Sequence, residues 1–191
     1  MNIKFNFSFE KATGAMAYLL QKLGPIEKVK LAKLLYMADR NHFLKFGYPI
    51  TGSRQVAMDY GPLPSECLKL LDGEWEKDPL AVFKYVHLDD NSVKLRDASA
   101  ADCLEESERK VLDTIAKSFG SAQTWDLVNH THEFPEYKEA YVKGTSKTIT
   151  YNSILRYYKA DDGFRHGRAV VSEATLKRMA YPFAAKSDAD L

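Results

Sequence analysis

The sequence predicts an α+β fold that is predominantly helical: a compact helical domain with one short extended segment and a β-hairpin. Apolar residues recur at three- and four-residue spacing over most of the chain, as they do on the buried face of a helix. Residues 53–60 instead alternate in the manner of a strand. In residues 83–97, two runs rich in Val, Tyr and Leu flank Asp89, Asp90 and Asn91, whose side chains favour a tight hairpin turn.

Composition limits the classes of protein that the chain can belong to. Its 191 residues are 45% hydrophobic, which is enough to bury a core without disulfide bonds. The net charge of +1 is too small for non-specific nucleic-acid binding. Cys67 and Cys103 are far apart and form no CxxC pattern, as is typical of reduced cytosolic thiols. We find no signal peptide and no apolar run near the ~20 residues of a membrane span, so we expect a cytoplasmic protein.

Two helices are expected first, over residues 9–23 and 26–46, with Gly24-Pro25 as the break between them. Ser8 is the expected N-cap of the first helix, and Gly47 is the expected residue after the end of the second. The second helix is expected to bury one stripe of side chains: Leu31, Leu34, Leu35, Ala38 and His42. Three of its lysines are expected to face water: Lys28, Lys33 and Lys45.

The middle of the chain is expected to be irregular. Residues 48–52 form a turn, and residues 61–65 break the extended segment, because glycine and proline interrupt strands. A short helix then runs from Pro64 or Ser65 to about residue 71. After the hairpin, residues 98–107 are a candidate linker between two helical lobes.

The second half is again helical. Helices are expected over residues 107–119, 121–132, 136–142, 150–158 and 172–181. In the second of these, Trp125, Leu127 and Val128 are expected to point inward. We expect a single domain over residues 1–185, with a flexible tail at 186–191.

No arrangement of reactive side chains predicts catalysis. His130 and His132 form an HxH pair, but residues two apart lie about 200° apart around a helix and cannot share a metal ion. Cys67 stands at an inward helical position, where a thiol usually only fills the core. Nucleotide-binding loops and zinc-type spacings are absent from the sequence. We therefore expect no enzyme activity, no metal and no cofactor.

DNA binding stays open as an alternative. The helix over 9–23, the break at Gly24-Pro25 and the helix over 26–46 resemble a helix-turn-helix in outline. Lys28, Lys30 and Lys33 lie near the N-terminal end of the second helix, where a recognition helix contacts DNA. Lysine-coated outer faces are also common on ordinary helical hairpins, so we regard nucleic acid as an unlikely partner.

Three motifs follow one another at suitable spacing: KLLYMADR at residues 33–40, GYPITG at 47–52 and VAMDYGPLPS at 56–65. A further set lies downstream, with Trp125-Asp126-Leu127 followed by THEFPEY at residues 131–137. Together they resemble the SocA-like Panacea domain antitoxin family over roughly residues 12–142, with residues 143–185 as a helical extension. Tyr137 departs from the family pattern, which often has Trp there, and His130-Thr131 replaces a more apolar pair.

The resemblance implies an antitoxin of a bacterial or prophage toxin–antitoxin pair, which neutralises its cognate toxin by direct protein–protein binding and has no catalytic activity. The toxin would be encoded by a neighbouring gene, with toxic small alarmone synthetases among the candidates. One branch of the family is instead a proteolytic adapter that delivers its toxin to a Clp-type protease. A homo-oligomer and a heterocomplex with the toxin are both compatible with this role.

Two sets of residues are candidates for this function, although core filling and turn formation explain many of them equally well. The family-motif residues, with a structural or partner-binding role, are Asp39, Arg40, Thr51, Gly52, Tyr60, Gly61, Pro62, Pro64, Ser65, His132 and Glu133. Aromatic side chains often anchor interfaces, and the candidate interface residues are Tyr48, Tyr85, Tyr141, Tyr157 and Tyr158. We expect the partner-specific contacts in residues 83–97 and beyond residue 143.

Overall fold

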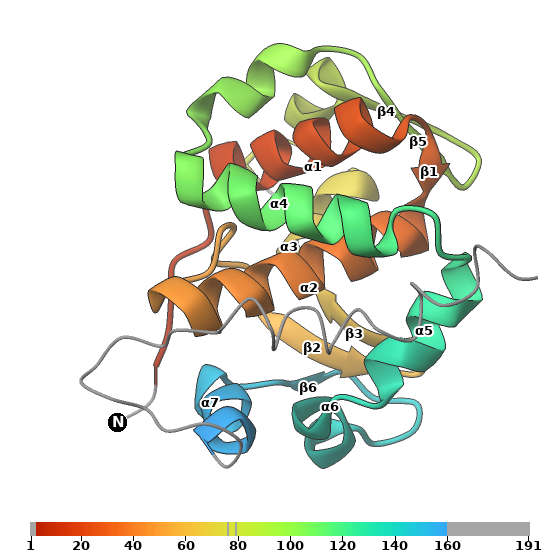
Figure 1. Cartoon of the computed structure of the whole chain (residues 1–191). Coiled ribbons are helices and arrows are strands. Elements are labelled where there is room, and N and C mark those ends of the chain that lie inside the picture. The colour runs from red at the N-terminus through yellow and green to blue at the C-terminus, as the bar shows by residue number, and fades with distance from the viewer. Residues whose placement is uncertain (1–2, 76, 79, 160–191) are drawn as a thin grey trace, which may run out of the picture.

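The structure, a computed structural model of the whole chain, describes residues 3–75, 77, 78 and 80–159. Within these residues the fold is α+β and predominantly helical, as the sequence predicts (Figure 1). The helix expected over residues 172–181 and the tail at 186–191 lie outside the described residues.

The first helix spans the expected residues, and the second ends where the sequence predicts but begins two residues later than expected. Helix α1 (Phe9–Leu23) is capped by Ser8, whose side chain accepts a hydrogen bond from the backbone N–H of Lys11 at 3.2 Å. Helix α2 (Lys28–Phe46) ends at Gly47, which has a left-handed φ of 88°. The two residues before α2 form a short strand, β1 (Ile26–Glu27), rather than its first turn.

Helix α2 lies in the middle of the molecule. Figure 1 shows α1 and α4 (Glu106–Phe119) on one side of it and the strands β2 (Gln55–Met58) and β3 (Gly61–Pro64) on the other. Every residue of α2 from Leu31 to Leu44 is buried. The expectation that Lys33 faces water is therefore wrong: its side chain is only 1% exposed, because β3 covers that face of the helix.

The expected β-hairpin is confirmed. Strands β4 (Val86–Asp89) and β5 (Ser92–Leu95) are antiparallel, with Asp89 opposite Ser92 and a two-residue turn at Asp90 and Asn91. Asp90 has a φ of 52°, a conformation that Asp and Asn tolerate better than most residues. Strand β1 pairs with β5 and completes a three-stranded sheet in the order β1-β5-β4. A 3₁₀ helix, η1 (Ala81–Lys84), precedes the hairpin.

The second sheet has the order β3-β2-β6, with β6 (Lys147–Thr148) paired to β2. The expected break at residues 61–65 is wrong in part, because Gly61–Pro64 returns as strand β3, with Gly61 opposite Met58 and Pro64 opposite Gln55. Two prolines are tolerated there because β3 is an edge strand, where a missing backbone N–H breaks no ladder bond.

The remaining described helices lie around α2, except for η2, which packs on α1. They are α3 (Ser65–Leu71), the 3₁₀ helix η2 (Ala98–Cys103), α5 (Thr124–His132), α6 (Pro135–Ala140) and α7 (Tyr151–Lys159). The candidate linker at 98–107 is wrong, because η2 packs against α1 and Lys11 Nζ donates to the carbonyl of Cys103 at 3.0 Å. The inward placement of Trp125 is also wrong: its side chain is 63% exposed.

A single hydrophobic core joins these elements. It includes Met16 and Leu19 from α1, Leu34 from α2, Leu112 from α4 and Ile154 from α7, all fully buried. Among the described residues, no helix combines the length and the apolar character needed to cross a membrane.

Candidate functional site

The family-motif residue Asp39 holds the turn that follows α2. Its buried carboxylate accepts hydrogen bonds from the backbone N–H of Thr51 at 2.8 Å and from the Thr51 hydroxyl at 2.5 Å. Gln55 Nε2 donates a third bond at 3.0 Å. Burial raises the pKa of Asp39 to about 6, although these hydrogen bonds favour the charged form. Asp39 and Thr51 thus connect α2 to the start of strand β2.

The same network continues to the start of α3. The Ser53 hydroxyl donates to Glu66 Oε2 at 2.8 Å and accepts from the backbone N–H of Glu66 at 3.1 Å. Ser65 lies beside it and accepts from the Arg54 guanidinium at 3.2 Å. Cys67 follows on the buried side of α3, where burial raises the pKa of its thiol, so the thiol stays protonated. These contacts fix the position of one end of α3.

Arg40 does not join the turn at residues 47–52. It points instead to α6, where its Nε donates to Glu136 Oε1 at 2.5 Å and its Nη2 to Oε2 at 3.4 Å. The Tyr36 hydroxyl donates to the same Oε1 at 3.1 Å, and the Phe134 ring covers the guanidinium at 4.6 Å. Arg40 is 5% exposed and Glu136 is fully buried, so this is a buried ion pair between α2 and α6. No local pattern indicates Glu136 as the partner of Arg40, because it lies 96 positions away.

Gly61 and His132, two more motif residues, meet at Lys33. Lys33 Nζ donates to the Pro62 carbonyl at 2.9 Å, and burial lowers the pKa of Lys33 to about 7. A Cβ atom at Gly61 would lie 2.8 Å from both Lys33 Nζ and His132 Cδ2, and Gly61 has a φ of 89°. The left-handed backbone and the closeness of these side chains both favour glycine at this position.

The neighbouring motif residues His132 and Glu133 have different surroundings: His132 is partly buried, and Glu133 lies on the surface. His132 stacks on Tyr137 with ring centroids 4.9 Å apart, and burial lowers the pKa of His132. Glu133 is exposed and pairs with Lys138 at 2.6 Å. Glu133 therefore takes no part in the buried contacts. Within the described part of the chain, no three His, Cys, Asp or Glu side chains form a group that could hold a metal ion.

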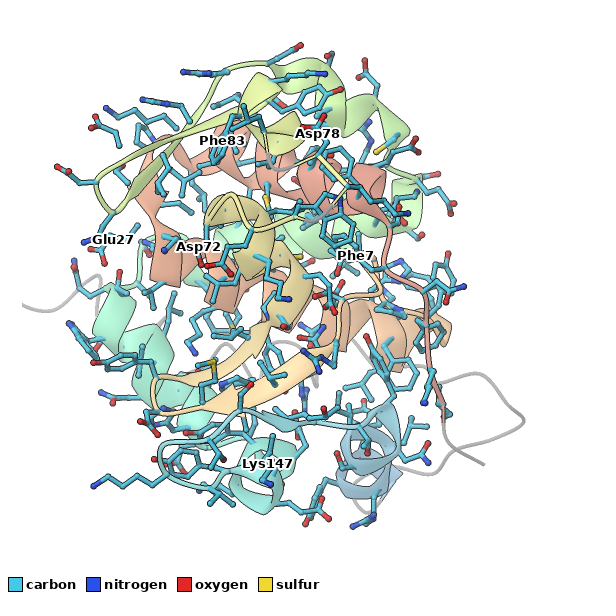
Figure 2. The ribbon with its side chains drawn as sticks, turned by 180° about the vertical axis from the view of Figure 1, so that it is seen from behind. Phe7, Glu27, Asp72, Asp78, Phe83 and Lys147 are labelled. Atoms are coloured by element: carbon cyan, nitrogen blue, oxygen red, sulfur yellow. The ribbon has the colours of Figure 1, made fainter. Side chains whose placement is uncertain are left out.

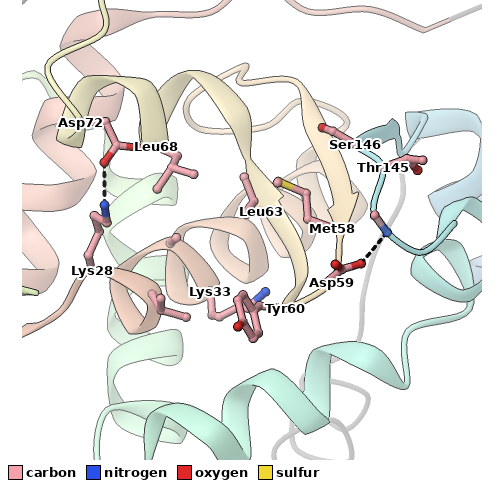
Figure 3. A pocket seen from close by; sticks show the side chains of 13 residues that line it. Lys28, Lys33, Met58, Asp59, Tyr60, Leu63, Leu68, Asp72, Thr145 and Ser146 are labelled. Carbon is pink, nitrogen blue, oxygen red and sulfur yellow. Dashed lines mark hydrogen bonds and ion pairs between the residues drawn. The ribbon is translucent and has the colours of Figure 1, made fainter.

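A pocket of about 460 Å³ opens beside the motif residues (Figure 3). Its apolar lining comes from the start of α2, from β2 and β3 and from α3: Val29, Ala32, Met58, Leu63 and Leu68. The Lys28–Asp72 ion pair, at 2.5 Å, borders one end. Asp59 borders the other end and accepts from the backbone N–H of Gly144 at 2.9 Å. We call this hollow the α2–β3 groove.

Tyr60 lines this groove and is 62% exposed. Its ring meets that of Trp125 edge-on, with centroids 5.7 Å apart. The sequence had placed Trp125 in the core, so this exposed aromatic pair was missed. A tryptophan in an amphipathic helix gives no local signal of which side it faces. Its spacing from the other apolar residues of the helix fits a place in the core and a place in a surface patch equally well.

The five candidate interface tyrosines lie in four places in the fold, with Tyr157 and Tyr158 both on α7. Tyr48 and Tyr157 are both 38% exposed, and Tyr85 and Tyr158 pack partly against the core. The Tyr141 hydroxyl donates to Asp59 at 3.1 Å and so reaches the rim of the α2–β3 groove.

The model of the family described as "Antitoxin SocA-like, Panacea domain" matches residues 31–138. This is more than half of the chain, and the chain therefore belongs to that family. The matched segment contains both partners of each buried contact described above: Asp39 with Thr51, Arg40 with Glu136, and Lys33 with Pro62. No curated protein and no solved structure matches the chain.

Proposed function

We propose that this chain is the antitoxin of a toxin–antitoxin pair and that it neutralises its cognate toxin by direct binding in the cytoplasm. The observation that carries this proposal is the family match over residues 31–138. The buried motif residues Asp39 and Arg40 hold α2 to the start of β2 and to α6. Such a scaffold supports a surface that recognises a partner, and this role needs no catalytic group.

Direct binding is favoured over DNA binding by the lysines of α2. Lys33 is buried against Pro62, and Lys30 donates to the carbonyls of Gly120 and Ala122 at 2.7 and 2.8 Å. Two of the three lysines expected near the N-terminal end of a recognition helix are thus engaged inside the fold. A row of cations free to contact phosphates is what such a helix requires.

The test uses the product of the gene next to the one that encodes this chain. We expect that product to arrest growth when it is induced alone, and growth to resume when this chain is expressed with it. The two proteins are expected to co-elute from a sizing column in a complex. If no adjacent product is toxic, or if growth resumes without any complex, direct neutralisation is wrong.

Toxin half-life separates neutralisation from proteolytic delivery. After translation is stopped, a bound toxin is expected to persist as long as the toxin alone or longer. An adapter would shorten the toxin half-life, and only in cells with the Clp-type protease. A shortened half-life would therefore replace the proposal with the adapter mechanism.

A further inference from the structure

The α2–β3 groove brings several exposed apolar side chains together. Nine large apolar residues are exposed among those that the structure describes. Val29, Met58 and Tyr60 line the groove, and Trp125 touches Tyr60 at its edge. Large exposed apolar patches with a polar border mark binding surfaces, and Tyr and Trp are the side chains most often found at the energetic centre of an interface.

Carboxylates border this apolar patch. A second hollow shares Lys28 and Val29 with the groove and is lined by Glu27, Asp89 and Asp90. Asp72 is paired with Lys28, and Asp89 with Lys94. Glu27 and Asp90 form no ion pair with any residue in the described ranges.

Glu27 and Asp90 thus place carboxylates in the hollow beyond the Lys28–Asp72 end of the groove, where Lys30 acts electrostatically on Glu27. At the opposite end, Lys143 acts electrostatically on Asp59 and offsets its charge. Lys147 adds no positive charge at the acidic end: Figure 2 shows Glu27 and Asp72 at one level of the molecule and Lys147 well below them.

We propose that the α2–β3 groove is the docking site for a segment of the toxin that inserts an apolar side chain next to Tyr60 and places Lys or Arg residues against Glu27 and Asp90. This inference rests on the proposed function, because its occupant is the toxin. It also shifts the expected contact surface. The turn at Asp90 and the loop at 144–146 lie in the regions where the sequence predicts partner contacts, whereas residues 28–33 lie outside those regions.

The aromatic pair gives the first test. We would measure the Kd between the full chain and the adjacent-gene product by calorimetry for Tyr60→Ala and Trp125→Ala. Each is expected to weaken binding by about tenfold or more. Leu80→Ala is the matched control, since Leu80 is 69% exposed and lies outside the groove; it is expected to bind within about twofold of the wild type. The docking site is wrong if the Tyr60 and Trp125 variants also bind within twofold.

Charge reversal gives the second test. Glu27→Lys and Asp90→Lys are expected to slow association and to reduce its dependence on salt, because opposite charges accelerate encounter and salt screens them. Asp102→Lys, at an exposed position on η2, is the control and should leave both quantities unchanged. Equal effects from all three variants would overturn the basic segment as the occupant.

The outcomes separate this inference from the proposed function. If the wild type does not bind the adjacent-gene product, both fail. If the wild type and the groove variants all bind and restore growth, only the docking site fails. If Tyr60→Ala converts a dimer of this chain to a monomer while toxin binding is unchanged, the groove is occupied by a second copy and the docking proposal is wrong. Thermal unfolding of each variant checks that it is folded.

Discussion

Asp39 accepts two hydrogen bonds from one residue, Thr51, through both the backbone and the side chain of that threonine. The two residues are 12 positions apart, and Gly52 follows directly in the chain. Through this contact, the last turns of α2 fix where strand β2 begins. The strand in turn carries Met58 to the α2–β3 groove, so the shape of the groove depends on a carboxylate buried in the core.

Replacing Asp39 by Ala is expected to destabilise the fold by on the order of 3–5 kcal/mol. The substitution leaves the Thr51 N–H, the Thr51 hydroxyl and the Gln55 amide buried without their acceptor, and each such loss is costly. Urea unfolding measures the change. Asp102→Ala, which removes an exposed carboxylate, should change the free energy of unfolding by about 0.5 kcal/mol or less. A change below about 1 kcal/mol for Asp39→Ala would contradict this role.

Removing Glu136 is expected to be more harmful than removing both members of its ion pair. Glu136→Ala leaves the Arg40 charge buried without its counter-ion, which should reduce stability by about 3–5 kcal/mol. The double variant Arg40→Met/Glu136→Leu removes both charges and fills much of the space. We expect it to be more stable than Glu136→Ala in chemical denaturation. The same stability for the two variants would show that the charge is not the cause.

Lys33 should make stability depend on pH in the alkaline range. Its pKa is lowered to about 7 in the folded protein from 10.5, so the unfolded chain binds more protons between these values. Stability should therefore rise with pH in this window, by about 1.4 kcal/mol per pH unit at most. We expect Lys33→Met to lose this slope between pH 7.5 and 10 in urea titrations, whereas Lys117→Met, at an exposed position, keeps it. An unchanged slope in Lys33→Met would show that Lys33 is charged in the fold.

Two pairs of glycines allow two costs of an alanine substitution to be measured separately: the strain of a left-handed backbone and the clash of the added Cβ atom with its neighbours. Gly52 and Gly144 have φ values of 68° and 70°, but a Cβ at Gly52 would overlap the Asn6 carbonyl oxygen, and one at Gly144 would meet nothing within 4 Å. Gly61 and Gly47, at 89° and 88°, differ in the same way.

Alanine at Gly144 or Gly47 is expected to reduce stability by about 1–2 kcal/mol, through the left-handed backbone alone. Alanine at Gly52 should reduce it by at least about 2 kcal/mol more, because the backbone of the N-terminal segment must move. At Gly61 the neighbours are side chains, so an intermediate loss is expected. Thermal melts of the four variants give the ranking, and equal losses within each pair would contradict it.

Local signals in the sequence located most of the elements. The Ser8 cap, the Gly47 helix end and the turn at Asp90 were read correctly, because each depends on residues within a few positions. The strand at Gly61–Pro64 was missed because its two prolines argue against a strand, and only its position at a sheet edge makes them acceptable.

Tertiary contacts decided the rest. Lys33 was expected in water because lysines usually face it, yet α2 is covered along both of its faces. The partner of Arg40 could not be found from spacing, since Glu136 lies on a helix almost 100 positions later. The family motifs identified Asp39, Thr51 and Gly61 as special without giving their roles. The interface role of Tyr48, Tyr85, Tyr141, Tyr157 and Tyr158 stays a prediction.

The segment shared by the family is not a unit that can be cut out. Helix α1 lies before residue 31 and α7 after residue 138, yet Met16 and Ile154 are both fully buried. Phe5 joins the two ends, because its ring meets Phe43 and Tyr151 edge-on at 5.8 and 4.9 Å. Grafting the shared segment of this chain onto another member of the family should therefore transfer the flanking helices with it, and an affinity tag at the N-terminus needs a spacer ahead of Phe5.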